Sequence, residues 1–158
     1  MNWELLLWIV PAYVANSTAT LSKFFPKRHP IDAGYVCRDG RRLLGNGKTW
    51  EGLIIGITFG TLAGWPLFWY FHIPYNAFLV AFGALLGDIV GSFAKRRIGL
   101  DRGAKAPVID QLDFIFGAFA LGGPLPAEYS ALFLLITPII HRTANIIGYI
   151  IGVKNEPW

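Results

Sequence analysis

Long apolar stretches separated by short polar ones dominate the chain. Four of them, at residues 3–22, 52–71, 75–94 and 127–153, have the length of roughly 20 residues that a helix needs to cross a bilayer. A shorter apolar piece covers residues 109–121, and prolines or glycines interrupt the pattern at residues 72–74 and 122–126. The pattern predicts an all-α, polytopic membrane protein with about five transmembrane helices, forming a single domain over residues 1–158.

Two connections, at residues 23–51 and 95–112, carry most of the charge. The first holds seven basic residues and the second five, out of 14 in the chain; Arg142 and Lys154 are the other two. Because Lys and Arg are enriched in cytoplasmic loops, we expect both connections to be cytoplasmic, with the N-terminus outside and the C-terminus inside. This predicts a multi-pass protein of the cell (plasma) membrane whose polar cavity faces the cytoplasm.

Composition supports the same environment. Apolar residues make up 54% of the chain and charged residues only 15%, which is more apolar than a soluble domain of this size needs. The net charge of +4 comes from loops beside the membrane, where basic residues set topology and attract anionic headgroups. The expected partner is therefore the lipid bilayer, and no nucleic acid is expected.

Two of the predicted helices carry glycines at every fourth position. The first series is Gly52, Gly56, Gly60 and Gly64, and the second is Gly83, Gly87 and Gly91. Small residues at this spacing let membrane helices approach closely. We favour helix packing over a ligand-binding role for both series.

Asp88 is the most informative single residue, because it lies inside the predicted helix at residues 75–94. An ionised carboxylate within a membrane is costly unless a cation, a metal or water meets it. Helical spacing puts Ser92 and then Lys95 or Arg96 on the same face, closer to the cytoplasm. That face therefore presents a carboxylate, a hydroxyl and cations near the headgroups.

Asp110 and Asp113 stand three residues apart where the short fourth helix should begin, so their carboxylates can converge on one side. Acidic residues at a helix N-terminus also complement the helix dipole, which explains either residue alone. It does not explain Asp88 or the nearby cations. A Mg²⁺ ion bound by a few carboxylates and substrate phosphates explains all of them.

The first polar connection ends in a glycine-rich segment that runs from Gly45 to Gly52. It is an incomplete P-loop, because Arg42 stands where the first glycine belongs and a membrane span follows. Lys48 and Thr49 can still cradle a phosphate, and Trp50 can stack on a base or anchor at the interface. Carboxylates, cations and this loop together favour phosphoryl or nucleotidyl transfer to a lipid, a reaction that needs positioning and charge neutralisation rather than a Ser-His-Asp triad.

Two elements resemble the signature of the integral-membrane CTP:phosphatidate cytidylyltransferases. One is Lys48-Thr49-Trp50-Glu51-Gly52; the other runs from Gly87-Asp88 through Ser92 and Lys95-Arg96 to Pro107 and Asp110-Gln111-Leu112-Asp113. The short chain, with its residues 11–16, 30–32 and 39–42, is more similar to the archaeal branch of that family, the CDP-archaeol synthases. The sequence departs from the signature at Asp101-Arg102, where the family has Lys-Asp, so the role of Asp101 stays open.

The resemblance implies that the phosphate of an unsaturated archaeal diether lipid attacks the α-phosphorus of CTP, giving CDP-archaeol (CDP-2,3-bis-O-(geranylgeranyl)-sn-glycerol) and pyrophosphate. The implied partners are CTP and the anionic diether lipid phosphate, with Mg²⁺ as cofactor; a homo-oligomer is compatible with the sequence. The implied catalytic residues are Asp88, Asp110, Asp113 and Lys95, and the three aspartates are the implied metal ligands. The implied substrate-binding residues are Asn16, Lys48, Thr49, Trp50, Ser92, Arg96 and Arg97.

A small transporter or channel is the main alternative, with Asp88 and the pair His141-Arg142 as an ion path. This hypothesis predicts ion or solute flux without CTP. By helical rise the pair lies at about two thirds of the membrane depth, where it can reach the same cavity or extend to the headgroups. A CDP-alcohol phosphotransferase is disfavoured, because its Asp-Gly-x-x-Ala-Arg pattern does not occur in the chain.

Overall fold

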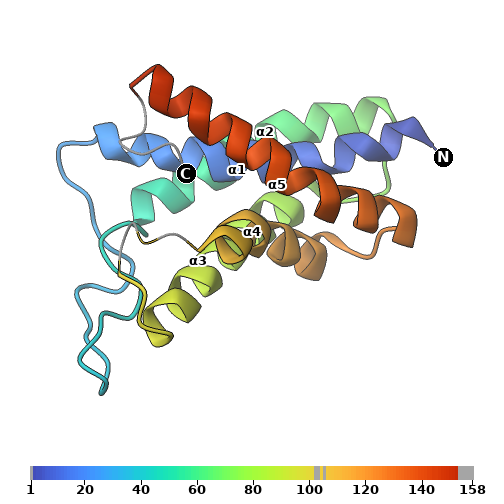
Figure 1. Cartoon of the computed structure of the whole chain (residues 1–158). Helices are drawn as coiled ribbons and strands as arrows, with labels where there is room; N and C mark the ends of the chain where they lie inside the picture. Colours follow the sequence, from blue (N-terminus) through green and yellow to red (C-terminus); the bar gives the residue numbers. More distant parts are fainter. Residues whose placement is uncertain (1, 102–103, 105, 153–158) are drawn as a thin grey trace.

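The structure, a computed structural model, describes residues 2–101, 104 and 106–152, and this part is helical (Figure 1). The helices, with η for a 3-10 helix, are η1 Trp3–Ile9, α1 Val10–Ala19, η2 Thr20–Phe24, α2 Trp50–Tyr70, α3 Ala77–Arg97, α4 Pro107–Gly122 and α5 Ala127–Ile150. Among the described residues, β structure is limited to two isolated bridges, Pro30–Thr49 and Val36–Arg42. The predicted all-α fold is confirmed.

Four helical segments of the described chain are long and apolar enough to cross a membrane. They are Trp3–Phe24, Trp50–Tyr70, Ala77–Arg97 and Ala127–Ile150. The 16 residues of α4 rise only about 24 Å, less than the roughly 30 Å of hydrocarbon in a bilayer. A helix thus lies at each predicted position, but α4 is shorter than a span, and the predicted orientation in the membrane stays a prediction.

The second polar connection is shorter than predicted, because both flanking helices extend into it. Lys95, Arg96 and Arg97 form the last turn of α3, where cations complement the partial negative charge of a helix C-terminus. Pro107 begins α4, and Asp110 lies in its first turn, both favourable at a helix N-terminus. The connection therefore covers residues 98–106 rather than 95–112. Arg102 and Lys154 lie outside the described residues.

The glycines of α2 line its contact with α1 and α3. A Cβ added to Gly56 would lie 2.7 Å from the carbonyl oxygen of Ala15, and one added to Gly60 would lie 2.7 Å from that of Pro11. These carbonyl oxygens belong to the backbone, so they cannot move aside as the end of a flexible side chain can. The predicted packing role of this series is confirmed.

The glycines of α3 serve its contact with α4. A Cβ on Gly83 would overlap the carbonyl oxygen of Gly117, and one on Gly87 would lie 2.9 Å from the Cα of Gly117. The two backbones therefore touch, and α4 is held against α3 along much of its length.

The apolar core lies toward the end of the bundle where the chain begins. The buried indole of Trp8 stacks on Phe119 and Phe133, with ring centroids 5.4 and 6.1 Å apart. The Tyr129 hydroxyl donates to the backbone oxygen of Asn2 at 2.9 Å. In Figure 1 the polar connection at residues 25–49 projects from the opposite end. The polar site described next lies toward that end.

Candidate active site

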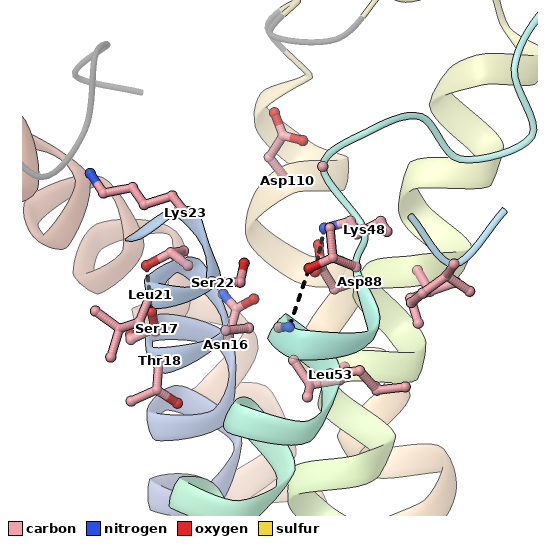
Figure 2. A pocket seen from close by; sticks show the side chains of 18 of the residues that line it. Asn16, Ser17, Thr18, Leu21, Ser22, Lys23, Lys48, Leu53, Asp88 and Asp110 are labelled. Carbon is pink, nitrogen blue, oxygen red and sulfur yellow. Dashed lines mark hydrogen bonds and ion pairs between the residues drawn. The ribbon is translucent and has the colours of Figure 1, made fainter. Parts of the chain in front are cut away.

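Four charged side chains from separate parts of the chain meet near the polar connections. Lys48 donates a hydrogen bond to the carboxylate of Asp88 on α3 (Figure 2). Lys95 lies about two turns further along the same face of α3. It donates to the carboxylate of Asp110 on α4. The four side chains are between 14% and 32% exposed, so the two ion pairs are largely shielded from solvent.

Lys48 is placed by the fold of the connection before α2. Its backbone oxygen accepts from the Ile31 amide at 2.9 Å, and the next residue, Thr49, caps α2 by accepting from the Gly52 amide at 3.2 Å. The Trp50 amide donates to the His29 oxygen at 3.0 Å. These bonds tie the segment around Lys48 to residues 29–31 and to the start of α2.

Asp32 organises the same connection from within. Its buried carboxylate accepts from the Arg42 guanidinium at 2.6 Å and from the amides of Gly34, Leu44 and Gly45 at 2.9 to 3.1 Å. Burial raises the pKa of this carboxyl, but the bonds from Arg42 and the three amides outweigh it and hold the pKa well below its usual range. Asp32 is therefore an ionised centre around which the connection folds.

Asp113 lies deeper, between α4 and α3. A Cβ on Gly91 would lie 2.7 Å from the Cβ of Asp113, so the absence of a side chain at Gly91 makes room for this carboxylate. Its Oδ1 accepts from the Phe114 amide at 2.7 Å, whereas its Oδ2 is buried without a hydrogen-bond partner among the described residues. Asp88, Lys95 and Lys48 lie close enough to interact electrostatically with the Asp113 carboxylate.

A cavity of about 720 Å³ opens beside the two ion pairs, and Figure 2 shows part of its lining. The predicted site residues that line it are Asn16, Lys48, Thr49, Asp88, Lys95, Arg96 and Asp110. The Nε of Arg96 is buried without a hydrogen-bond partner among the described residues. The cavity therefore joins α1, the segment around Lys48, α3 and α4 in one polar space.

The other predicted residues lie outside the described lining. Trp50 is half exposed at the start of α2, and Ser92 is buried within α3. Arg97 donates to Asp39 at 2.8 Å and to the backbone oxygen of Arg42 at 2.7 Å. In this structure Arg97 therefore holds the first polar connection against the end of α3.

Several lining residues had no predicted role. They include Lys23 and Arg28, near the end of η2, and Asn145 on α5. His141 on α5, which the sequence placed within reach of the cavity or of the headgroups, also lines the cavity. The amide nitrogen of Asn145 lies 3.3 Å from the His141 Nδ1. Of the two positions left open by the sequence, His141 lies at the cavity and Arg142 is exposed on another face of α5.

The carboxylates suit a hard cation that brings other ligands with it. No group of three His, Cys, Asp or Glu side chains within the described ranges is close enough to hold a metal ion by itself. Mg²⁺ is usually bound by one or two carboxylates together with substrate phosphates and water. Asp88 and the unpartnered oxygen of Asp113 fit that mode of binding.

A family model described as CarS-like, CDP-archaeol synthase, matches residues 2–158. The chain belongs to this family. The CDP-archaeol synthase of Pyrobaculum islandicum is 45% identical to it, over 98% of this chain and 96% of the relative. That of Methanocaldococcus jannaschii is 41% identical, over 97% and 95%. A solved structure, of an intramembrane enzyme for archaeal membrane lipid biosynthesis, matches with a TM-score of 0.81 and 38% identity, over 92% of this chain and 95% of that one.

Membership of the CDP-archaeol synthases confirms the resemblance that the motifs around Lys48 and Asp88 indicated. It makes the chain a membrane-embedded cytidylyltransferase, and it leaves the transporter hypothesis without support.

Proposed function

We propose that this chain transfers the CMP moiety of CTP to an archaeal diether lipid phosphate, with Mg²⁺, in the cavity beside the two lysine–aspartate pairs. The observation that carries the proposal is the convergence of Lys48, Asp88, Lys95 and Asp110 on one cavity. Near them, one buried oxygen of Asp113 has no hydrogen-bond partner in the described part of the chain. The cations can contact the oxygens of a triphosphate, and the carboxylates can bind the Mg²⁺ that it carries.

The reaction needs little covalent chemistry from the protein. A phosphate oxygen of the lipid attacks the α-phosphorus of CTP and forms the new P–O bond. The bond from the α-phosphorus to the oxygen that bridges to the β-phosphorus breaks, and pyrophosphate leaves. The attacking phosphate is already ionised at neutral pH, so the chain's task is to align the two substrates and neutralise charge.

The cavity residues divide this task by charge. In the proposed reaction Lys48, Lys95 and Arg96 contact the phosphates of CTP, because all three line the cavity and the two lysines pair there with Asp88 and Asp110. Asp88 and Asp113 would hold Mg²⁺, with Asp110 beside them. When bound, Mg²⁺ supplies charge neutralisation at the triphosphate.

The proposed location is the inner face of the cell membrane. The cavity lies toward the end of the bundle that carries the basic connections, and such connections are typically cytoplasmic. CTP would then enter from the cytoplasm, and the lipid phosphate from the inner leaflet.

Purified protein with Mg²⁺, CTP and a diether lipid phosphate tests the proposal. We expect CDP-lipid and pyrophosphate in equal amounts, and no product after the metal is removed with EDTA. A parallel reaction with a diester phosphatidic acid tests the choice of lipid, and we expect it to be slower. Absence of CDP-lipid with every lipid phosphate supplied would overturn the proposal.

A further inference from the structure

The first polar connection runs beside the end of α3 (Figure 1), and charged side chains join the two. Arg97 donates to Asp39 at 2.8 Å and to the backbone oxygen of Arg42 at 2.7 Å. In the other direction, the Nη1 of Arg41 donates to the backbone oxygen of Arg96 at 3.5 Å. We call Asp39, Arg41, Arg42 and Arg97 the clasp. All four lie outside the described lining of the cavity.

The end of α3 is shaped to receive both arginine side chains. Gly99 has a φ of +89°, and a Cβ added to it would lie 2.5 Å from the Nη1 of Arg41. The Arg41 guanidinium therefore lies against the turn that follows α3, where a cation complements the partial negative charge of a helix C-terminus. The Arg97 guanidinium lies over the Phe93 ring, 5.3 Å from its centre, at the distance of a cation–π contact. The hydrogen bonds of the clasp thus have support from the packing around them.

Further contacts lead from the clasp to Lys48. The Arg42 guanidinium donates to the buried carboxylate of Asp32 at 2.6 Å. Ile31, the neighbour of Asp32 in the chain, donates its amide to the Lys48 backbone oxygen at 2.9 Å. The connection is therefore braced without interruption from the clasp to the backbone of Lys48.

The connection thus meets α3 at two places. One is the clasp at Arg97, and the other is the ion pair of Lys48 with Asp88. Nine residues of α3 separate Asp88 from Arg97, a rise of about 14 Å. In the proposed reaction Asp88 would meet the Mg²⁺ that CTP carries, and Lys48 would turn to the phosphates. The clasp, which lies outside the described lining, would stay in place.

We propose that Arg97 is a positioning residue, which through the clasp keeps Lys48 at the cavity before CTP arrives. This rests on the proposed function, and it gives Arg97 a different role from the substrate contact that the family resemblance implied. Ordering a loose segment costs conformational entropy. A connection that is already held on α3 lets CTP bind without that cost.

The reactivity of the single cysteine reports the clasp in the absence of CTP. Cys37 lies in the same turn, and its amide donates to the Arg41 backbone oxygen at 2.8 Å. Arg97→Gln should release the turn and speed the reaction of Cys37 with a thiol reagent at least about threefold. Loss of the cation alone would slow this reaction, because a nearby positive charge favours the thiolate. Lys27→Gln, which removes the same charge from an exposed residue of the same connection, should leave the rate unchanged.

Steady-state kinetics report the effect on CTP. We expect Arg97→Gln to raise the KM for CTP about tenfold, as for the loss of a charge-assisted hydrogen bond. The kcat at saturating CTP should stay within about threefold of wild type, because bound CTP then holds Lys48 itself. A variant that is merely destabilised would instead lose kcat at an unchanged KM, since less of it is active. Lys27→Gln should change neither constant.

The conservative variant Arg97→Lys separates positioning from direct contact with CTP. Lysine lacks the fixed fork that lets arginine hold Asp39 and the Arg42 oxygen together, so Arg97→Lys should raise the KM for CTP about as much as Arg97→Gln. A lysine beside a phosphate would keep most of the attraction. A near-normal KM in Arg97→Lys would therefore contradict the assignment.

Equilibrium binding of CTP shows whether Arg97 acts through Lys48. Lys48→Gln should weaken binding, and adding Arg97→Gln to it should weaken binding by less than about twofold more, because the two residues share one effect. Asp39→Asn removes one contact of the clasp at an exposed position. It should change labelling and binding in the same direction as Arg97→Gln but less, and it carries the test if Arg97→Gln does not fold.

Three results would overturn the assignment. An unchanged rate of Cys37 labelling would show that Arg97 does not hold the connection, and weaker CTP binding at that unchanged rate would place Arg97 at the nucleotide. Faster labelling with unchanged CTP binding would separate the clasp from the site. Additive losses in the double variant would show that Arg97 does not act through Lys48. A wild-type protein that binds CTP but forms no CDP-lipid would refute the proposed function, while labelling and binding still decide the role of the clasp.

Discussion

Asp88 and Asp113 illustrate how single residues set the chemistry of this cavity. Asp88 is paired with Lys48. Asp113, which lies against Gly91, has one oxygen with no hydrogen-bond partner within the described ranges. Both residues are partly shielded from solvent, and in the proposed reaction they would meet the Mg²⁺ that CTP carries.

Replacing Asp88 by Asn should reduce kcat by at least about 100-fold, the usual cost of removing a group that stabilises transferring charge. The side chain keeps its shape, so the fold should persist. Initial rates of CDP-lipid formation measure the effect. Glu128→Gln, an exposed change at the start of α5, should keep wild-type rates. Full activity of Asp88→Asn would remove this carboxylate from the site.

Asp32 should matter for stability and for its pH dependence. Its carboxyl has a lowered pKa in the folded protein, so its stabilisation is present above the ordinary value of about 3.9 and is lost as pH falls below it. Asp32→Asn should lower the free energy of unfolding by about 2 kcal/mol at neutral pH.

Thermal unfolding in detergent at pH 7 and at lower pH measures both effects. The variant's deficit should shrink as wild type is acidified. Asp101→Asn, at an exposed position of the second connection, should leave the midpoint unchanged. A deficit that stays constant down to low pH would mean that the ionised carboxylate of Asp32 is not the stabilising form.

The sequence could identify a site residue where its charge is costly in a membrane or where it stands in an unusual motif. Asp88 is costly in a span, and Lys48 stands in a distinctive glycine-rich segment. Arg28 gave no such signal, because basic residues in loops are common, and for His141 the sequence left open whether it reaches the cavity or the headgroups. Their position at the cavity depends on how η2 and α5 face each other, which local spacing does not determine.

At the scale of elements, the contact between α3 and α4 joins packing to the site. Gly83, Gly87 and Gly117 bring the two backbones together, and Gly91 receives the side chain of Asp113. A change that separates these helices should therefore also move Asp113.

Gly87→Ala should reduce both stability and activity, because its Cβ would meet the backbone of Asp113 and Gly117. We expect a loss of about 2 kcal/mol or more, typical of overpacking. The unfolding midpoint and the rate of CDP-lipid formation report the two effects. Val90→Ile adds one carbon on an exposed face of the same helix and should change little. A Gly87→Ala protein as stable as wild type would contradict the close approach of α3 and α4.

The helices themselves were predictable, because long apolar stretches leave few alternatives in a bilayer. Their ends were less so. Lys95 to Arg97 were expected in a connection because they are charged, yet as the last turn of α3 they complement the helix dipole. The apolar piece at residues 109–121 also begins earlier than predicted, at Pro107, and forms the 16-residue helix α4.

For the whole molecule, the orientation predicted from the uneven distribution of basic residues can be tested with the chain's single cysteine. Cys37 lies in the first polar connection. A membrane-impermeant thiol reagent should label it in inside-out vesicles and leave it unlabelled in right-side-out cells. In a Cys37→Ser background, Glu128→Cys at the other end should give the reverse pattern. Labelling of Cys37 from outside would invert the proposed topology.

The central claim is that the cavity transfers the CMP part of CTP to a lipid phosphate. Parallel reactions with CTP labelled at the α- or at the γ-phosphate test it most directly. The account predicts that the α-label appears in the lipid fraction and the γ-label in pyrophosphate, in equal amounts and only with the lipid phosphate present. Label from the γ-phosphate in the lipid, or release of pyrophosphate without labelled lipid, would contradict it.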